Sequence, residues 1–329
     1  GGMLHVDGVG EMRPQPGADD PAPRWDDAQP RTYPGATHSR ALEGGLLIAV
    51  LLLAFAVRTV RLDAQSLWYD EAVSAQVAAK GLAELARWTA DDIQPPLYYI
   101  FLAGWTRVAG HGEWALRFPS VFFGTATIAL LWSLARRLYG RGPRGSLVAL
   151  LTAGMAAIAP LYVYYAQEAR MYTQLTFFGA LAGYALLRAV SAPEGRRAIR
   201  WWAATAMASL AALYTHYFAL FLLAAFALCA LVALALARGR VAVWQIRNAV
   251  ATIVLVGLGY LPWLPSMLNR YRVDASYWQG DLKLAEALRH IAISFTTGAP
   301  ETMLETDAVR WLPWFAIAFA AALVGLWLG

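Results

Sequence analysis

Residues 41–72 read ALEGGLLIAVLLLAFAVRTVRLDAQSLWYDEA, an apolar run that is followed within a few residues by two adjacent acids. The run near 44–60 approaches the length of about 20 mostly apolar residues that a membrane helix needs. Similar runs recur near 118–138, 146–165, 171–190, 201–216, 217–237, 248–267 and 311–329. The pattern predicts an all-α polytopic membrane protein with a bundle of about eight transmembrane helices.

The composition supports a lipid-embedded chain. Hydrophobic residues make up 59% and charged residues 15%, whereas soluble domains carry about 25% charged residues. The net charge of +5 comes from arginines in short connectors between apolar runs. It therefore indicates membrane topology rather than a nucleic-acid partner. The single cysteine, Cys229, excludes a disulfide within the chain.

The beginning of the chain differs in composition from the rest. Residues 1–42 are rich in Pro, Gly, Asp and Arg and lack apolar periodicity, which predicts a disordered cytoplasmic tail. Residues 43–329 are expected to form one transmembrane domain. Its last apolar run reaches the final residue, which leaves open whether the natural protein continues past residue 329.

The orientation depends on the stretch from Pro95 to Val108, which is short for a span. If it does not cross the membrane, only Arg170 lies in the short outer connectors. Eleven arginines then lie on the cytoplasmic side, as the positive-inside rule favours: Arg136, Arg137, Arg141, Arg144, Arg188, Arg196, Arg197, Arg200, Arg238, Arg240 and Arg247. We therefore predict that 61–117 is the first outer loop. It is expected to hold two surface helices, one at about 70–88 and one at Pro95–Val108.

Asp70 and Glu71 are the first candidates for chemistry because they follow the first span directly. A carboxylate near a low-dielectric boundary is costly unless it is paired or used. One interpretation is a general base with an orienting or metal-binding partner. The other is helix capping, because an acid in the first turn stabilises a helix start. Spacing alone does not separate the two.

Further candidates lie in the outer segments, and each has a structural alternative. Asp91 and Asp92 are either a polar turn before a Pro-Pro pair or carboxylates of the same pocket, which Tyr98 would also line. Arg117 is either a phosphate ligand or an interfacial anchor. Two other connectors add three candidates. Glu168 and Arg170 are either functional residues or an ion pair that locks a tight turn. His216 is either a packing residue or part of a metal or proton-transfer site.

The sequence suggests two further hypotheses, a metal site and a group of basic residues that binds lipid phosphate. Glu71, Asp92 and His216 are the set that would hold a divalent metal ion, the one cofactor considered. A long outer loop contains several cations that would attract a lipid phosphate or simply coat a solvated helix near 281–295: Arg270, Arg272, Lys283, Arg289 and His290.

The ordered motifs WYDEA (68–72), QPPLYY (94–99), EWALRFPS (113–120), ARRLYG (135–140) and YYAQEARMYT (164–173) resemble the GT-C membrane glycosyltransferases. More narrowly, they are similar to the ArnT-like and protein O-mannosyltransferase-like group, the dolichyl-phosphate-mannose-protein mannosyltransferase type. The resemblance covers about residues 44–240. Many relatives have a His or a charged residue where Gln94 stands, and often an acid where Tyr172 stands.

The resemblance implies a multi-pass protein of the bacterial inner membrane, with a cytoplasmic N-terminus and its site on the periplasmic face. It implies transfer of a hexosyl or pentosyl group from a polyprenyl-phosphate donor to a lipid, glycan or protein acceptor. Asp70 matches the expected catalytic base, and Arg117 and Arg170 match arginines near the carrier phosphate. The rival class is a transporter or flippase of lipid-linked sugars, which would need charges inside spans and helices broken at the midplane.

Overall fold

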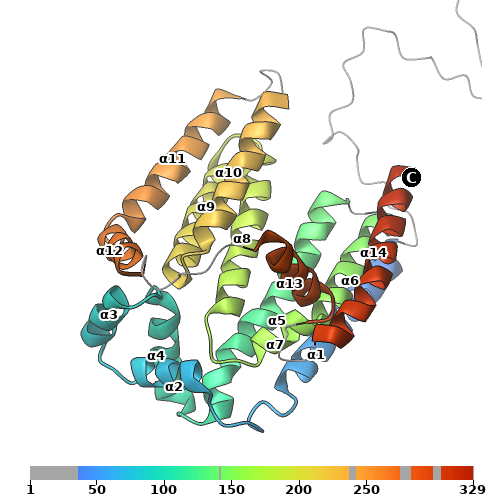
Figure 1. Ribbon diagram of the computed structural model, residues 1–329. Helices are drawn as coiled ribbons and strands as arrows, with labels where there is room; N and C mark the ends of the chain where they lie inside the picture. Colours follow the sequence, from blue (N-terminus) through green and yellow to red (C-terminus); the bar gives the residue numbers. More distant parts are fainter. Residues whose placement is uncertain (1–35, 141, 237–241, 275–282, 299–304, 329) are drawn as a thin grey trace, which may run out of the picture. The chain divides into compact units, whose positions relative to one another are not determined.

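The computed structural model describes residues 36–140, 142–236, 242–274, 283–298 and 305–328, and all regular structure in these ranges is helical (Figure 1). The chain divides into two units, residues 1–42 and residues 43–329. The tail expected at 1–42 lies almost entirely outside the described residues. The helices are α1 (Ala36–Thr59), α2 (Tyr69–Ala78), α3 (Leu82–Asp91), α4 (Leu97–Ala109), α5 (Glu113–Leu138), α6 (Pro143–Ile158), α7 (Pro160–Ala166), α8 (Tyr172–Val190), α9 (Arg196–Thr215), α10 (Ala219–Leu236), α11 (Val243–Tyr260), α12 (Leu264–Asp274), α13 (Leu284–Thr296) and α14 (Glu305–Leu328).

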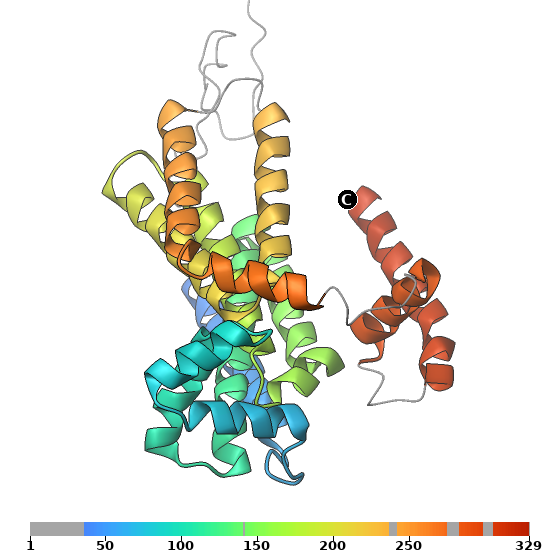
Figure 2. The ribbon, with the colours of Figure 1, turned by 60° about the vertical axis from the view of Figure 1, so that its left-hand side comes forward.

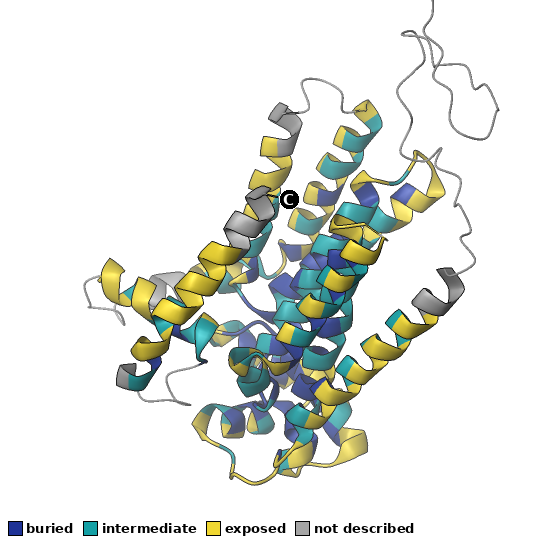
Figure 3. Cartoon of the chain, turned by 90° about the vertical axis from the view of Figure 1, so that its right-hand side faces the viewer, coloured by how far each residue is buried: buried dark blue, intermediate teal, exposed yellow. Residues whose placement is uncertain are grey.

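The all-α membrane fold is confirmed, and three of the described helices are long and apolar enough to cross a bilayer. They are Ala41–Thr59 within α1, then α5 and α11, and the bent pair α6 and α7 makes a fourth if it is one span. Helices α8, α9, α10 and α14 cover the other predicted runs. The count of about eight spans stays a prediction. Figure 3 shows buried residues inside the helix bundle and exposed residues along its outer helix faces, many of them apolar, as lipid contact requires.

The bend between α6 and α7 has an identifiable cause. The two helices meet at 56°, where Pro160 removes the backbone donor that would bond the carbonyl of Ala156. The fully buried Arg58, on the last turn of α1, supplies the missing donors. Its Nη2 donates to Ala156 O at 3.1 Å and its Nη1 to Ala157 O at 2.8 Å. An arginine from another helix therefore satisfies the carbonyls that the break exposes.

Small residues set how closely the helices pack around this point. A side chain at Gly124 of α5 would place its Cβ 3.0 Å from Ala166 Cβ and 3.4 Å from Arg58 Nε. Farther along, α8 and α9 pack against each other, and each contains fully buried alanines, Ala182 and Ala185 in α8 and Ala212 in α9. Such residues let membrane helices approach closely, so dispersion contacts hold the bundle together.

The first long connector contains three short helices, α2, α3 and α4, instead of the two predicted. The expected helix at about 70–88 is interrupted after Ala78, and Gly81 becomes the N-cap of α3. Glycine is unfavourable inside a helix and is accepted at an N-cap, where Gly81 takes an extended conformation. In Figure 2 these helices lie together at one end of the long helices. Helix α4 has 13 residues, too few to span a bilayer of about 30 Å.

Three connectors meet at this end of the bundle: residues 60–112, 167–171 and 216–218. We call it the loop end. The side chain of Gln167 reaches the end of α1, where its Nε2 donates to Val60 O at 3.1 Å. At the opposite end, Arg136 pairs with Glu43 at 3.1 Å, and Arg188 lies at the end of α8. The arginine-rich connectors and the candidate site residues are therefore separated as expected.

Candidate functional site at the loop end

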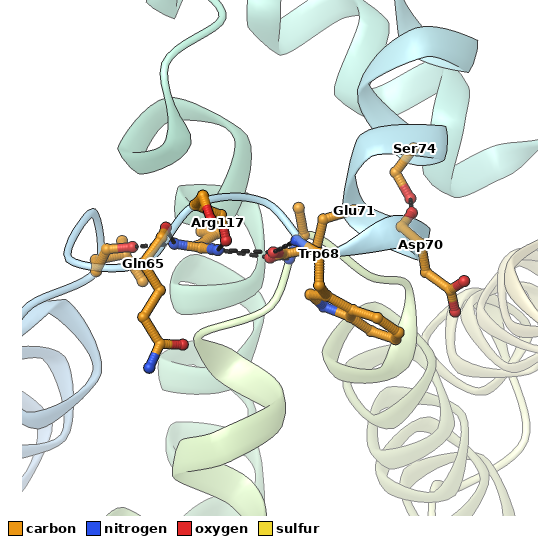
Figure 4. A network of polar contacts seen from close by, with 9 residues as sticks. Gln65, Trp68, Asp70, Glu71, Ser74 and Arg117 are labelled. Carbon is orange, nitrogen blue, oxygen red and sulfur yellow. Dashed lines mark hydrogen bonds and ion pairs between the residues drawn. The ribbon is translucent and has the colours of Figure 1, made fainter.

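Asp70 and Glu71 occupy the first turn of α2, whose N-cap is Trp68. Glu71 Oε2 accepts a hydrogen bond from the backbone N–H of Trp68 at 3.3 Å. The capping interpretation is thus correct for Glu71, because it satisfies a donor that the helix start leaves free. Figure 4 shows the two carboxylates pointing apart, so the adjacent acids have different surroundings.

Glu71 is fully buried and forms a bidentate ion pair with Arg117 of α5 (Figure 4). Arg117 Nε donates to Oε1 at 2.8 Å and Nη2 donates to Oε2 at 2.6 Å. The backbone N–H of Ala169 adds a further bond to Oε1 at 2.8 Å. Both carboxylate oxygens are therefore used by the protein, and Glu71 joins α2, α5 and the 167–171 connector at one point.

Arg117 has no donor left for a ligand in this arrangement. Besides Glu71, its guanidinium donates to three backbone carbonyls of the 60–68 segment, Leu62 at 2.7 Å, Gln65 at 2.9 Å and Ser66 at 3.3 Å. A planar fork with five donors suits such a cluster of acceptors. The geometry favours a role in shaping the first loop over the phosphate contact expected from the sequence.

Asp70 remains accessible. Its side chain is 35% exposed, and Oδ2 lies 3.3 Å from Arg170 Nη2. Its backbone carbonyl accepts from Ser74 Oγ at 2.8 Å, as in an ordinary helix turn. Asp70 is thus the member of the pair that a substrate can reach while its position is held by the start of α2.

Arg170 is buried but weakly satisfied, in contrast to Arg117. Its contacts with Asp70 are long, 3.3 Å to Oδ2 and 3.4 Å to the backbone carbonyl, and its Nε has no hydrogen-bond partner. Its guanidinium carbon lies 5.8 Å from the centre of the Tyr172 ring. A buried guanidinium whose Nε lacks a partner and whose contacts with Asp70 are long is suited to receive an anionic ligand.

Two adjacent tyrosines of α4 lie behind this pair. Tyr98, a predicted ligand contact, is buried with an unpaired hydroxyl; burial, followed by the neighbouring Tyr99, raises its pKa well above the usual value. Burial also raises the pKa of Tyr99, with Arg170 opposing and Asp92 and Asp70 adding to the rise. Both phenols therefore stay protonated, and Tyr99 is the point around which Asp70, Asp92 and Arg170 gather.

His216 faces the same cluster from the connector between α9 and α10. Its Nδ1 accepts the backbone N–H of Phe218 at 3.0 Å, and its ring centre lies 6.1 Å from that of Tyr172. Burial, together with the charge of Arg170, lowers the pKa of His216 to about 4. The imidazole is neutral near pH 7, and the bond at Nδ1 places its proton on Nε2.

The remaining predicted residues are placed less centrally. Asp91 ends α3 and is exposed, whereas Asp92, at the C-cap of α3, is half-buried. Glu168 is buried, and its charge acts on both Tyr98 and Arg117. Arg170 therefore links the predicted residues, because its charge acts on His216 and on both tyrosines, and Tyr99 also feels Asp70 and Asp92.

The predicted metal ligands do not form a site. In the described parts of the chain no three His, Cys, Asp or Glu side chains come together to hold an ion. Glu71 is engaged by Arg117 and Ala169, which separates it from the Asp70 side. We therefore derive no step through a metal at Glu71, Asp92 and His216.

The cations of the long loop are only partly described. The side chains of Arg270 and Arg272 lie outside the described residues. Lys283 and His290 both pair loosely with Glu286 on α13, at 3.7 Å and 3.9 Å. Two residues of this region, Arg58 and Tyr99, were not predicted from the sequence. Arg58 could have been noticed as a charge at the end of an otherwise apolar span. Nothing in the sequence distinguishes Tyr99 from the adjacent Tyr98.

The family model described as dolichyl-phosphate-mannose-protein mannosyltransferase matches residues 93–264, which is more than half of the chain. The chain belongs to this family. The matched range of this mannosyltransferase family includes Arg117, Arg170 and His216 and begins after Asp70 and Glu71. No curated protein matches the chain.

Two solved structures support the family fold. One is the protein O-mannosyltransferase Pmt1–Pmt2 complex of S. cerevisiae bound to the sugar donor, with 20% identity, a TM-score of 0.55, and coverage of 70% of this chain and 34% of that one. The other is ArnT from Cupriavidus metallidurans in the apo state, with 18% identity, a TM-score of 0.55, and coverage of 73% and 45%. The GT-C-like fold is confirmed, and the chain spans less than half the length of either relative.

Proposed function

We propose that the protein is a glycosyltransferase that moves a sugar from a polyprenyl-phosphate donor to a hydroxyl of a lipid, glycan or protein acceptor. The observation that carries the proposal is the partly exposed carboxylate of Asp70, 3.3 Å from the weakly satisfied guanidinium of Arg170. A base and a cation are the two groups that such a transfer needs side by side. Membership of the mannosyltransferase family supports the donor class.

The reaction assigns one role to each side chain. Asp70 accepts the proton of the acceptor hydroxyl as its oxygen forms a bond to the anomeric carbon of the sugar. The bond from that carbon to the phosphate oxygen breaks, and its electron pair leaves with the polyprenyl phosphate. Arg170 stabilises the charge that develops on this phosphate. Neutral His216 adds an Nε2–H donor on the same side, and Glu71 and Arg117 hold the loop that positions Asp70.

The orientation belongs to the same proposal. The arginine-rich connectors at the end opposite the loop end favour a cytoplasmic location for that end. The loop end then faces the periplasm of a bacterial inner membrane, where a donor anchored in the outer leaflet presents its sugar. The acceptor would approach Asp70 from water, and the prenyl chain would stay in lipid.

A flippase for lipid-linked sugars is the second candidate, because the α6–α7 pair is a broken helix of the kind that transporters use. Two features count against it. The break lies only eight residues before Gln167 of the loop end, rather than near the middle of a span. The carbonyls of Ala156 and Ala157 at this break accept hydrogen bonds from Arg58, so they are not available to a ligand.

The test is Asp70→Asn in proteoliposomes supplied with a panel of polyprenyl-phosphate hexoses and pentoses. We expect a loss of transfer of about 10²–10⁴-fold, the usual effect of removing a general base, with an unchanged melting temperature. Asp63→Asn is the matched control, because Asp63 is an exposed acid of the same loop. Unchanged transfer by Asp70→Asn would refute the assignment of the base. Wild-type protein that moves labelled lipid across the membrane without transferring sugar would favour the flippase.

A further inference from the structure

Helix α13, Leu284–Thr296, presents its apolar side away from the protein. Leu284, Leu288, Ile291 and Phe295 are 64%, 57%, 54% and 75% exposed. Their spacing of four, three and four residues places them within an arc of about 60° at 3.6 residues per turn. Large exposed apolar stripes of this kind mark a surface that contacts something other than water.

The opposite side of α13 is polar and mostly exposed, and Ile293 is its one buried apolar residue in the described helix. Ile293 lies about 180° from the stripe and is buried. It stands among Glu286, Arg289 and His290, and Glu286 forms the loose ion pairs of this face. A helix on a water-soluble protein shows the reverse order, with the apolar face inward. In α13 the apolar stripe faces away from the protein instead, as in a helix whose apolar face contacts lipid.

The length of α13 and the residues near it favour a position at the membrane–water interface over one in the bilayer core. The 13 residues of α13 extend only about 20 Å, too short for a hydrocarbon layer of about 30 Å. The helix packs against α14, a helix of 24 residues, and also contacts α7. Trp311 and Trp314, both exposed, lie in the early part of α14. Tryptophans of this kind gather where membrane meets water.

We propose that α13 lies in the membrane interface, parallel to the bilayer surface, with the stripe of Leu284, Leu288, Ile291 and Phe295 in the acyl chains. The partner is the lipid surface itself. The exposed apolar residues of α1, such as Ile48 and Leu52, then meet the same lipid phase. The contact between α13 and α7 holds the start of the 167–171 connector next to the headgroups.

The test measures the environment of two sides of α13 by fluorescence. Cys229→Ser removes the single native cysteine, and Ile291→Cys or Glu286→Cys then takes a nitrobenzoxadiazole label. The proteins are reconstituted in bilayer nanodiscs that contain either nitroxide-labelled lipid or iodide in the buffer. Glu286 is the control because it lies on the other face of the same helix.

An interfacial helix buries its apolar face by about 5–10 Å. We therefore expect the nitroxide lipid to quench the fluorescence of the label at 291 at least about twofold more strongly than that of the label at 286. Iodide should show the reverse order. Equal iodide quenching at both positions would overturn the proposal, as would protection at 291 from both quenchers, which would indicate a protein partner such as a second copy. Leu288→Cys repeats the measurement if Ile291→Cys does not elute as wild type. The assay uses no sugar donor, so its result is independent of the proposed activity.

Discussion

Replacing Glu71 with Gln tests whether the buried pair with Arg117 holds the first loop. Glu71 accepts four hydrogen bonds, two from Arg117 and one each from the backbones of Ala169 and Trp68. The amide keeps one acceptor oxygen and turns an N–H₂ group toward donors. It also leaves the Arg117 charge buried without a counter-charge.

Removing one partner of a buried ion pair costs about 3–5 kcal/mol. Large domains lose roughly 2–4 °C of melting temperature per kcal/mol, so we expect a fall of roughly 6–20 °C in detergent micelles, measured by scanning fluorimetry. Arg117→Lys should also destabilise, because an ammonium has three donors and cannot reach Glu71 and three carbonyls at once.

Glu84→Gln is the matched control. Glu84 of α3 forms a short ion pair, at 2.7 Å, with Lys80 just before the helix, but the Glu84 side chain is 57% exposed. Solvent screens such pairs, so little change in melting temperature is expected. If Glu71→Gln and Glu84→Gln melt at the same temperature, the Glu71–Arg117 pair does not support the fold and the argument from its geometry is wrong.

Two further predictions concern packing and protonation. Gly124→Ala should lower the free energy of unfolding by about 1–3 kcal/mol, because its Cβ would stand 3.0 Å from Ala166 Cβ. Gly104→Ala, which meets open space on α4, should instead raise it by about 0.5–1 kcal/mol, and equal effects on the melting temperature would contradict the tight contact. For His216, the folded pKa of about 4 lies below the ordinary 6.5, so the unfolded chain binds more protons between these values. Stability should then fall by about 3 kcal/mol as the pH drops from 6.5 through 4, and His216→Gln should lose that part of the slope; parallel melting curves for the two proteins would refute the buried neutral imidazole.

Sequence patterns predicted the helices better than the contacts between them. The apolar runs near 44–60, 118–138 and 248–267 correspond to α1, α5 and α11 because a span must hide a fixed length of backbone from lipid. The first-loop break at Gly81 was missed, since a single glycine lowers helix stability by only a small amount and does not itself dictate a turn.

The site was predicted in part. Asp70, Glu71, Arg117 and Arg170 were all named, but sequence spacing could not show that the adjacent acids point to different partners. The contact between Glu71 and Arg117 joins residues 46 positions apart. It therefore depends on how α2 packs on α5, and this packing is what distinguishes a buried structural acid from an accessible one.

The bond from Arg58 to the carbonyls at the α6–α7 break implies that two distant positions in the chain constrain each other. With an ordinary residue at 160 the carbonyl of Ala156 would have its own helical donor. Arg58 would keep its bond to Ala54 O but would no longer be needed at Ala156. With Pro160 present, any shorter side chain at 58 would leave the bend unsatisfied. Pro160 and Arg58 should therefore be exchanged together in related chains, and a sequence that keeps Pro160 but has lost Arg58 should show a compensating donor elsewhere around Gly124.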